Sequence, residues 1–341
     1  MNRFACWCLS AAAAAALVCL PAMSAAQGLG LKRYRSHALY ADRTTLYCGD
    51  GCDLVIVDMK DLGNPVLLSR LSFSNEISAI RACRGYLLVA TLGGGVTVFD
   101  TVNPTKIRQV STFTEWTDIY GMDVKGHHVA LAVGMRGVAL ADASDERQMR
   151  VMATFDTPGE ACDVVMFRDS LLVADGMGGL HVAQQKTNGE WGIRQTIQTR
   201  DASLRVAIAD GPVVILSDRT SLRLFEFANG SPELRETGAH RSQRLSAAFV
   251  DIVTDGPVAY AAAEMGGLEV LDCSRPDTPQ PVGAFIPGRE VFAVALHGDR
   301  VFLLLKNREI RVLDISSPAR PTEVATVGLD QLPILRVGKE Y

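Results

Sequence analysis

The sequence predicts an all-β protein, one domain folded as a seven-bladed β-propeller with four antiparallel strands in each blade. A short apolar motif recurs seven times at nearly constant spacing, and each period holds four apolar runs of strand length. The 341 residues are 48% hydrophobic and 21% charged, which is enough for a core of this size. No run shows the sustained 3.6-residue periodicity of an amphipathic helix.

The recurring motif is clearest at residues 54–58, which read LVIVD. Its copies end at residues 58, 100, 142, 184, 226, 272 and 314, so the period is 42 residues in every interval but one, which is 46. A period of about 42 residues with four strands is typical of a propeller blade. The fifth copy departs most, because it ends in Glu226 and the turn before it, at 218–221, lacks glycine.

Turn signals separate the four runs of each period. In the fourth period the runs lie at 161–167, 171–174, 180–183 and 193–199, and a glycine-rich hairpin at 176–179 joins the second run to the third. An aspartate ends the third run in most blades, where it can accept backbone N–H groups in an Asx-turn. Metal ligation is the alternative for these aspartates, but equivalent positions in a ring lie far apart. The aspartates are Asp58, Asp100, Asp142, Asp272 and Asp314.

The N-terminal segment predicts export. Arg3 is the only charge before an apolar stretch that ends near Leu20, and small residues follow up to Ala26. This pattern is typical of a signal peptide, and the stretch is short for a membrane anchor of about 20 residues. We therefore expect a signal peptide at 1–26, a lead-in at 27–33, the propeller at 34–327 and a C-terminal tail at 328–341. The protein is expected to be exported, either to the periplasm or to the cell surface and the medium. After cleavage of the signal peptide, no membrane span is expected.

Charge and cysteine content narrow the function classes. The net charge is −4 and no basic patch or long Lys/Arg run occurs, which argues against nucleic acid and anionic membranes as partners. Five of the eight cysteines follow the predicted signal. Cys48 and Cys52 flank a hairpin tip, where they form either a local disulfide or two free thiols.

The motif at 54–58, the segments 155–161 and 173–176, and the turn at 314–318 resemble the LVIVD-repeat family, exported or cell-surface propellers of bacteria and archaea. The resemblance covers nearly all of the chain after the predicted signal. It implies a propeller fold and a location outside the cytoplasm. It implies no activity, and no catalytic residue is carried over from it.

One face of the predicted ring, here called the top face, carries the crossovers between blades and the turns between second and third strands. Two rings of residues around the channel mouth follow from the repeat register. The first ring lies 24 positions before the last residue of each motif and consists of Tyr34, Glu76, Asp118, Glu160, Ala202, Ala248 and Glu290. The second ring lies three positions further along the chain and consists of His37, Ala79, Gly121, Asp163, Arg205, Asp251 and Ala293. Four of the first seven are acidic, where 38 acidic residues in 341 predict fewer than one. The mouth is therefore expected to be acidic on several sides.

The acidic mouth has two interpretations, a site that attracts a cation or a basic partner, and ordinary solvated loop residues. Trp116, in a polar crossover, is either a partner contact or a filler of the gap between blades. The predicted binding residues on the top face are Glu76, Asp118, Glu160, Asp163, Arg205, Asp251, Glu290, His37 and Trp116.

No zinc-ligand spacing, nucleophile elbow or phosphate-binding loop occurs in the sequence. The sequence favours a non-catalytic exported scaffold that binds a protein, a glycan or another envelope component through its top face, without a cofactor. The alternative is a metal-dependent propeller hydrolase with a divalent cation at the acidic mouth, so enzymatic activity is left open.

Overall fold

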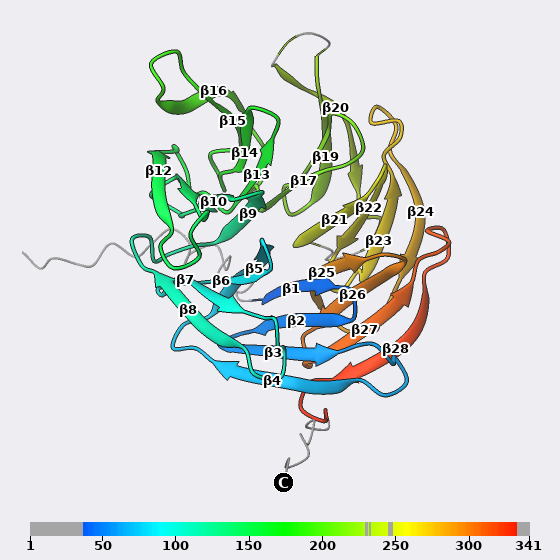
Figure 1. Cartoon of the computed structure of the whole chain (residues 1–341). Coiled ribbons are helices and arrows are strands. Elements are labelled where there is room, and N and C mark those ends of the chain that lie inside the picture. The colour runs from blue at the N-terminus through cyan, green and yellow to red at the C-terminus, as the bar shows by residue number, and fades with distance from the viewer. Residues whose placement is uncertain (1–36, 229–230, 232, 245–247, 333–341) are drawn as a thin grey trace, which may run out of the picture. The chain divides into compact units, whose positions relative to one another are not determined.

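Every regular element of the computed structural model is a β-strand. The structure describes residues 37–228, 231, 233–244 and 248–332. Within them, 28 strands form seven sheets of four antiparallel strands (Figure 1), which confirms the predicted seven-bladed propeller. The described ranges contain no helix that is long and apolar enough to cross a membrane. The predicted signal peptide at 1–26 and the lead-in at 27–33 fall outside the described residues, as do residues 333–341 of the predicted tail.

The strands follow one another along the chain, four to a blade, from the inside of the ring outward. Blade 1 has β1 (His37–Asp42), β2 (Thr45–Asp50), β3 (Asp53–Asp58) and β4 (Val66–Ser72). Blade 2 has β5 (Ile77–Cys83), β6 (Tyr86–Thr91), β7 (Gly95–Asp100) and β8 (Arg108–Phe113). Blade 3 has β9 (Gly121–Lys125), β10 (His128–Ala132), β11 (Val138–Asp142) and β12 (Arg150–Phe155).

The other four blades repeat this order. Blade 4 has β13 (Asp163–Phe167), β14 (Ser170–Ala174), β15 (Leu180–Gln185) and β16 (Trp191–Ile197). Blade 5 has β17 (Arg205–Ile208), β18 (Val213–Ser217), β19 (Ser221–Phe227) and β20 (Leu234–Arg241). Blade 6 has β21 (Asp251–Asp255), β22 (Val258–Ala262), β23 (Leu268–Asp272) and β24 (Gln280–Phe285). Blade 7 has β25 (Val291–His297), β26 (Arg300–Leu305), β27 (Glu309–Asp314) and β28 (Thr322–Gly328).

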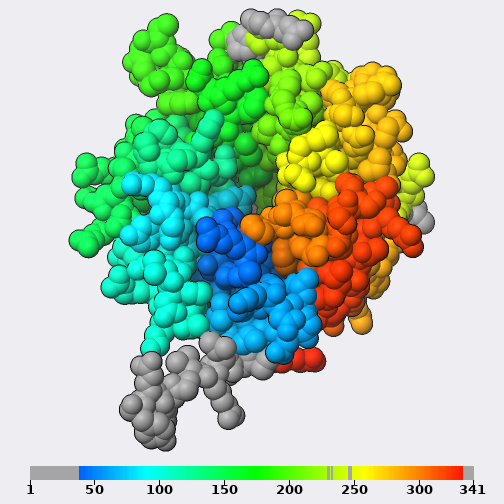
Figure 2. Space-filling model, turned by 45° about the vertical axis from the view of Figure 1, so that its right-hand side comes forward, coloured from blue at the N-terminus to red at the C-terminus, as the bar shows by residue number. Residues whose placement is uncertain are grey.

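The first strand of every blade lines the centre of the ring. Each contacts the first strands of both neighbouring blades, and β25 contacts β1, so the circle is closed. The fourth strands lie at the periphery (Figure 1). Figure 2 shows the blades packed side by side around a recess between the blue strands of blade 1 and the yellow strands of blade 6.

The hydrophobic core lies between blades. The middle strands β2 and β3 are buried along most of their length, whereas the outer strand β8 is half-exposed. One core cluster joins Leu88 of blade 2 to Leu131 of blade 3, and another joins Ala132 of blade 3 to Val173 of blade 4. Because an isolated blade would leave both apolar faces in water, packing into a ring is what buries them.

In four blades the turn from second to third strand closes on a glycine that no other residue could replace without strain. Gly95, Gly137, Gly179 and Gly267 occupy equivalent positions with φ between +72° and +91°. A Cβ on any of them would lie 2.1–2.3 Å from a carbonyl oxygen of the fourth strand of the same blade. Blade 5 has Ser221 instead, and its turn is held by Asp218, whose Oδ1 accepts the backbone N–H (2.9 Å) and the hydroxyl (2.7 Å) of Ser221.

The aspartates at the ends of the third strands form the predicted Asx-turns. In five blades the carboxylate accepts the backbone N–H of the residue two positions on, at 2.7–3.0 Å. These hydrogen bonds lower the pKa of the Asp142 and Asp272 carboxyls. The repeating aspartate is therefore a turn-forming residue. The five carboxylates belong to Asp58, Asp100, Asp142, Asp272 and Asp314.

Backbone pairs between blades locate the top face. The turn from second to third strand pairs with the crossover that leads into the next blade, as in Gly134 with Ala161 and Gly176 with Ser203. Both of these pairs exchange two N–H···O bonds, of 3.0–3.1 Å and 2.9–3.2 Å. Turns and crossovers therefore share one face, as the repeat predicted.

The ring closes at a seam between blade 7 and blade 1, which are joined by side-chain contacts and by a hydrogen bond from Arg70 to the Leu329 carbonyl (2.7 Å). Blade 1 is made wholly of β1–β4 and blade 7 wholly of β25–β28, so no strand is exchanged. A core cluster including Leu46 and Leu304 fills the seam. Across it the Arg308 guanidinium contacts the carboxylate of Asp50 in blade 1 (2.6 Å), and on its own side it also contacts Asp330, just after β28 (3.2 Å).

We expect Arg308→Gln to lower the free energy of unfolding by about 1–3 kcal/mol, because it leaves the mostly buried Asp50 carboxylate without its cation. Urea unfolding measures this change. The matched control is Arg235→Gln, which breaks an ion pair whose side chains are 71% and 60% exposed and should cost less than about 0.5 kcal/mol. Equal losses in the two variants would show that the seam does not depend on this ion pair.

Candidate functional site

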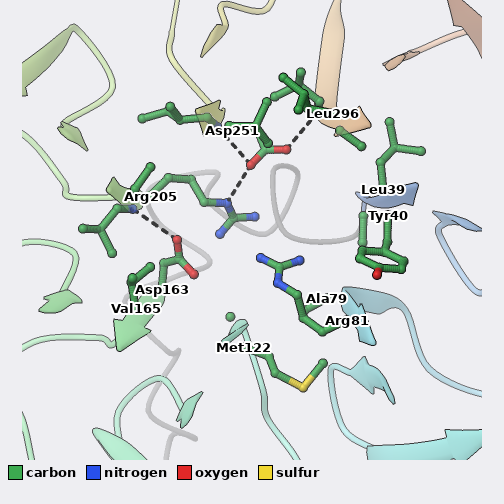
Figure 3. Close-up of a pocket in the computed structure, with 18 of the residues that line it drawn as sticks. Leu39, Tyr40, Ala79, Arg81, Met122, Asp163, Val165, Arg205, Asp251 and Leu296 are labelled. Atoms are coloured by element: carbon green, nitrogen blue, oxygen red, sulfur yellow. Dashed lines mark hydrogen bonds and ion pairs between the residues drawn. The ribbon is translucent and has the colours of Figure 1, made fainter. Parts of the chain in front are cut away.

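The first strands enclose a cavity of about 370 Å³ in the central channel. Three of the predicted binding residues line it, each at the first position of its strand: Asp163 in β13, Arg205 in β17 and Asp251 in β21. Arg81 of β5 joins them, with the apolar side chains of Leu39, Met122, Val165 and Leu296 (Figure 3). Part of the channel wall therefore follows from the register of the repeat.

The two channel carboxylates bind neighbouring blades. Asp163 Oδ2 accepts the N–H of Val206 (3.1 Å), and Asp251 Oδ2 accepts the N–H of Val294 (2.9 Å). In both pairs the donor lies 43 residues further along, on the first strand of the next blade. Burial raises the pKa of both carboxyls, although the charges of Arg205 and Arg81 oppose the shift.

Arg81 is a cavity residue that was not predicted from the sequence. It lies two residues beyond Ala79 on β5, on the same side of the strand because side chains alternate. Its signal is present in the repeat register, at the next position of the first strand that faces the same side as Ala79. Its guanidinium extends into the middle of the cavity, as does that of Arg205 (Figure 3).

The four acidic residues predicted on the rim do not line the cavity, and the structure places them in different surroundings. Glu160 is buried, Asp118 is exposed, Glu76 is half-buried, and Glu290 Oε2 lies 3.0 Å from Lys306 Nζ. Within the described part of the chain, no three His, Cys, Asp or Glu side chains are grouped so that they could hold a metal ion. A divalent cation at the mouth stays a prediction. His37 begins β1, and its side chain is outside the described part.

The remaining predicted residues also have defined places. Trp116 is half-buried against the core between blades 2 and 3, with the Arg136 guanidinium carbon 5.6 Å from its ring centroid. Cys48 and Cys52 are free thiols. Cys48 is buried in the core of the seam, where burial raises its thiol pKa.

Three exposed methionines on the top face were also missed. Met135, Met177 and Met265 occupy the same position in the turns of blades 3, 4 and 6, and are 64%, 58% and 52% exposed. In each turn the preceding residue has positive φ and pairs with the next crossover, which leaves the methionine at the tip. Their signal was an apolar residue where a hairpin tip usually carries glycine, asparagine or aspartate.

A buried polar network lies in blade 4 and does not line the cavity. Asp175 accepts hydrogen bonds from the Thr157 hydroxyl (2.6 Å), the Gly159 N–H (2.7 Å) and His181 Nε2 (2.8 Å). His181 Nδ1 lies 2.9 Å from the Thr196 hydroxyl oxygen. Asp175 and His181 are fully buried. The network ties the crossover from blade 3 to the second, third and fourth strands of blade 4, and this is a structural role.

Fold and site together define a β-propeller protein whose channel is lined by ionic groups. A family model for the LVIVD repeat matches residues 288–328. The chain is therefore a β-propeller that carries an LVIVD repeat, in agreement with the resemblance of its sequence. No protein of curated function matches the chain significantly.

Solved structures show the same fold at low identity. A functionally unknown protein from Desulfotomaculum acetoxidans is 14% identical, with a TM-score of 0.65 over 83% of this chain and 94% of that one. Sqt1 from Saccharomyces cerevisiae is 11% identical, with a TM-score of 0.63 over 85% and 84%. The β-propeller domain of Cps50 (Swd1) from Myceliophteria thermophila is 16% identical, with a TM-score of 0.61 over 82% and 94%. These likenesses extend to the fold alone.

We expect Asp175→Asn to lower the free energy of unfolding by about 2–4 kcal/mol, because an amide cannot accept all three of the hydrogen bonds that the carboxylate accepts and buried donors are left unpaired. Chemical denaturation of the purified protein measures the loss. Asp169→Asn, at an exposed turn of the same blade, is the control and should stay within about 0.5 kcal/mol of the parent. If both variants unfold alike, the network does not stabilise the blade.

Proposed function

We propose that this chain is an exported, non-catalytic scaffold that binds a protein partner through its top face. The observation that carries the proposal is the set of three exposed methionines, Met135, Met177 and Met265, at equivalent turn tips. The LVIVD repeat and the signal-like segment at 1–26 support an address outside the cytoplasm.

Exposed apolar side chains gathered on one face favour a protein partner over a glycan. Methionine is unbranched and polarizable, so it adapts to irregular apolar surfaces and is frequent in protein-binding sites. Ile286, 59% exposed just after β24, adds to the apolar side chains near the crossover into blade 7. Glu290, which lines the same small groove as Met265, supplies polar surface of the kind that rims protein interfaces.

The turns hold these methionines on a rigid frame. The residue before each methionine pairs with the backbone of the next blade, as Glu264 does with Val291. The backbone therefore loses little freedom on binding, and mainly the side chains must be ordered. An adaptable side chain on a fixed turn suits a scaffold that must hold its partner in one orientation.

We expect the variant Met135→Ser/Met177→Ser/Met265→Ser to fold normally and to bind its partner at least tenfold more weakly. The partner would be captured from an envelope extract and identified, and its affinity measured by biolayer interferometry with both proteins purified. Met152→Ser is the matched control, because Met152 is 57% exposed but lies on the outer strand β12. Binding should also protect the three turn methionines, and not Met152, from peroxide oxidation. Unchanged affinity in the triple variant would refute binding through this face.

Export has its own test. When the full chain is expressed with its own N-terminus in a bacterium, the protein recovered outside the cytoplasm should begin at Gln27. N-terminal sequencing and fractionation measure this. An uncut chain that stays in the cytoplasm would contradict the proposed address.

A further inference from the structure

We propose that the central channel binds a small oxyanion, a carboxylate or a phosphate, between the guanidinium groups of Arg81 and Arg205. This site goes beyond the proposed function, because the cavity is lined by the first strands and by none of the three turn methionines.

The two guanidinium groups face each other across one confined space. Arg81 belongs to blade 2 and Arg205 to blade 5, on nearly opposite sides of the ring, and both extend into the middle of the cavity (Figure 3). Two like charges in a partly desolvated cavity repel each other. An anion between them turns this repulsion into two favourable interactions.

Both arginines have unused donors. Among the described residues, Arg81 makes one hydrogen bond, from Nη1 to the carbonyl of Ile80 at 2.9 Å, and none of their carboxylates lies within 4.0 Å of its guanidinium nitrogens. Arg205 Nε lies 3.6 Å from Asp251 Oδ1, and Arg205 Nη1 lies 3.5 Å from the Leu204 carbonyl oxygen. A guanidinium fork with free N–H groups is suited to bidentate recognition of carboxylate or phosphate.

The channel carboxylates serve mainly the backbone, apart from the 3.6 Å ion pair between Asp251 and Arg205. Asp163 Oδ2 and Asp251 Oδ2 accept N–H groups of the next blade, and Asp251 Oδ1 also accepts the N–H of Ile252 at 3.1 Å. Burial raises the pKa of both carboxyls, so they take up protons at a higher pH than an exposed aspartate. As they do, the positive charge of the two arginines is less compensated.

The size and lining of the cavity limit the ligand. About 370 Å³ is near the lower end of the roughly 300–1,000 Å³ typical of small-molecule sites. The apolar side chains of Leu39, Met122 and Val165 lie beside the arginines. These features fit a short dicarboxylate or a phosphate monoester, and leave too little room for a polymer.

The test is calorimetric titration of the purified protein with sulfate, as a phosphate analogue, and separately with succinate, in chloride-free buffer of low ionic strength. We expect saturable binding of one ion per chain. A preference for sulfate would indicate a phosphate ligand, and a preference for succinate a carboxylate ligand. Arg81→Gln should weaken binding at least tenfold, and Arg81→Lys, which keeps the charge and loses the fork, by less. Arg235→Gln removes an exposed charge on β20 and should bind as the parent does.

Sulfate keeps its charge between pH 5 and 8, so any change of sulfate affinity with pH in this range comes from ionisable groups of the protein. We expect sulfate affinity to rise as the pH falls, because Asp163 and Asp251 become protonated. The ionisable residues that line the cavity are Tyr40, Arg81, Tyr120, Asp163, Arg205 and Asp251.

Two results would overturn the proposal: no saturable binding of either anion by the parent protein, or parent-like affinity in Arg81→Gln. The titration of the parent protein needs no variant, so it tests the proposal even if a variant fails to fold. Neither of these results bears on partner binding by the turn methionines.

Discussion

The structure depends on one constraint, that each four-stranded sheet is apolar on both faces. Strands such as β2 and β3 are buried along most of their length, so neither face of their blade can remain in water. A row of such sheets would leave two faces bare at its ends, and closing the row into a ring covers them. The central cavity and the shared face of turns and crossovers follow from that closure. Closure itself rests on the seam, where the apolar cluster and Arg308 take the place of exchanged strands.

The polar residues of the channel show how a site and a framework can use the same groups. Asp163 and Asp251 looked like part of an acidic binding site, yet their oxygens hold the next blade through its backbone N–H groups. Arg81 and Arg205 have guanidinium N–H groups that the contacts between blades do not use. The sign of the charge that a ligand meets in the channel therefore depends less on the number of carboxylates than on which charged groups are still available to bind it.

The fold could be predicted from the sequence because the repeat carries both the strand count and the period. The same register located Asp163, Arg205 and Asp251, since side-chain direction along a strand alternates and can be counted. The register does not fix the surroundings of the rim acids, because crossovers have no such period: Glu160 is buried whereas Asp118 is exposed. The turn methionines were missed because a glycine-rich turn indicates a connection and says nothing of which side chain its tip presents.

The making of every blade from four consecutive strands has a consequence for the order of folding. All pairings within a sheet are local in sequence, so a blade can form as soon as its roughly 40 residues are available, without waiting for a distant strand. A chain that emerges N-terminus first would thus add blades one after another. Only the packing of the last blade against the first is a long-range step. Until it happens, blade 1 exposes an apolar face to water, and such a face favours a trapped folding intermediate or the association of two chains.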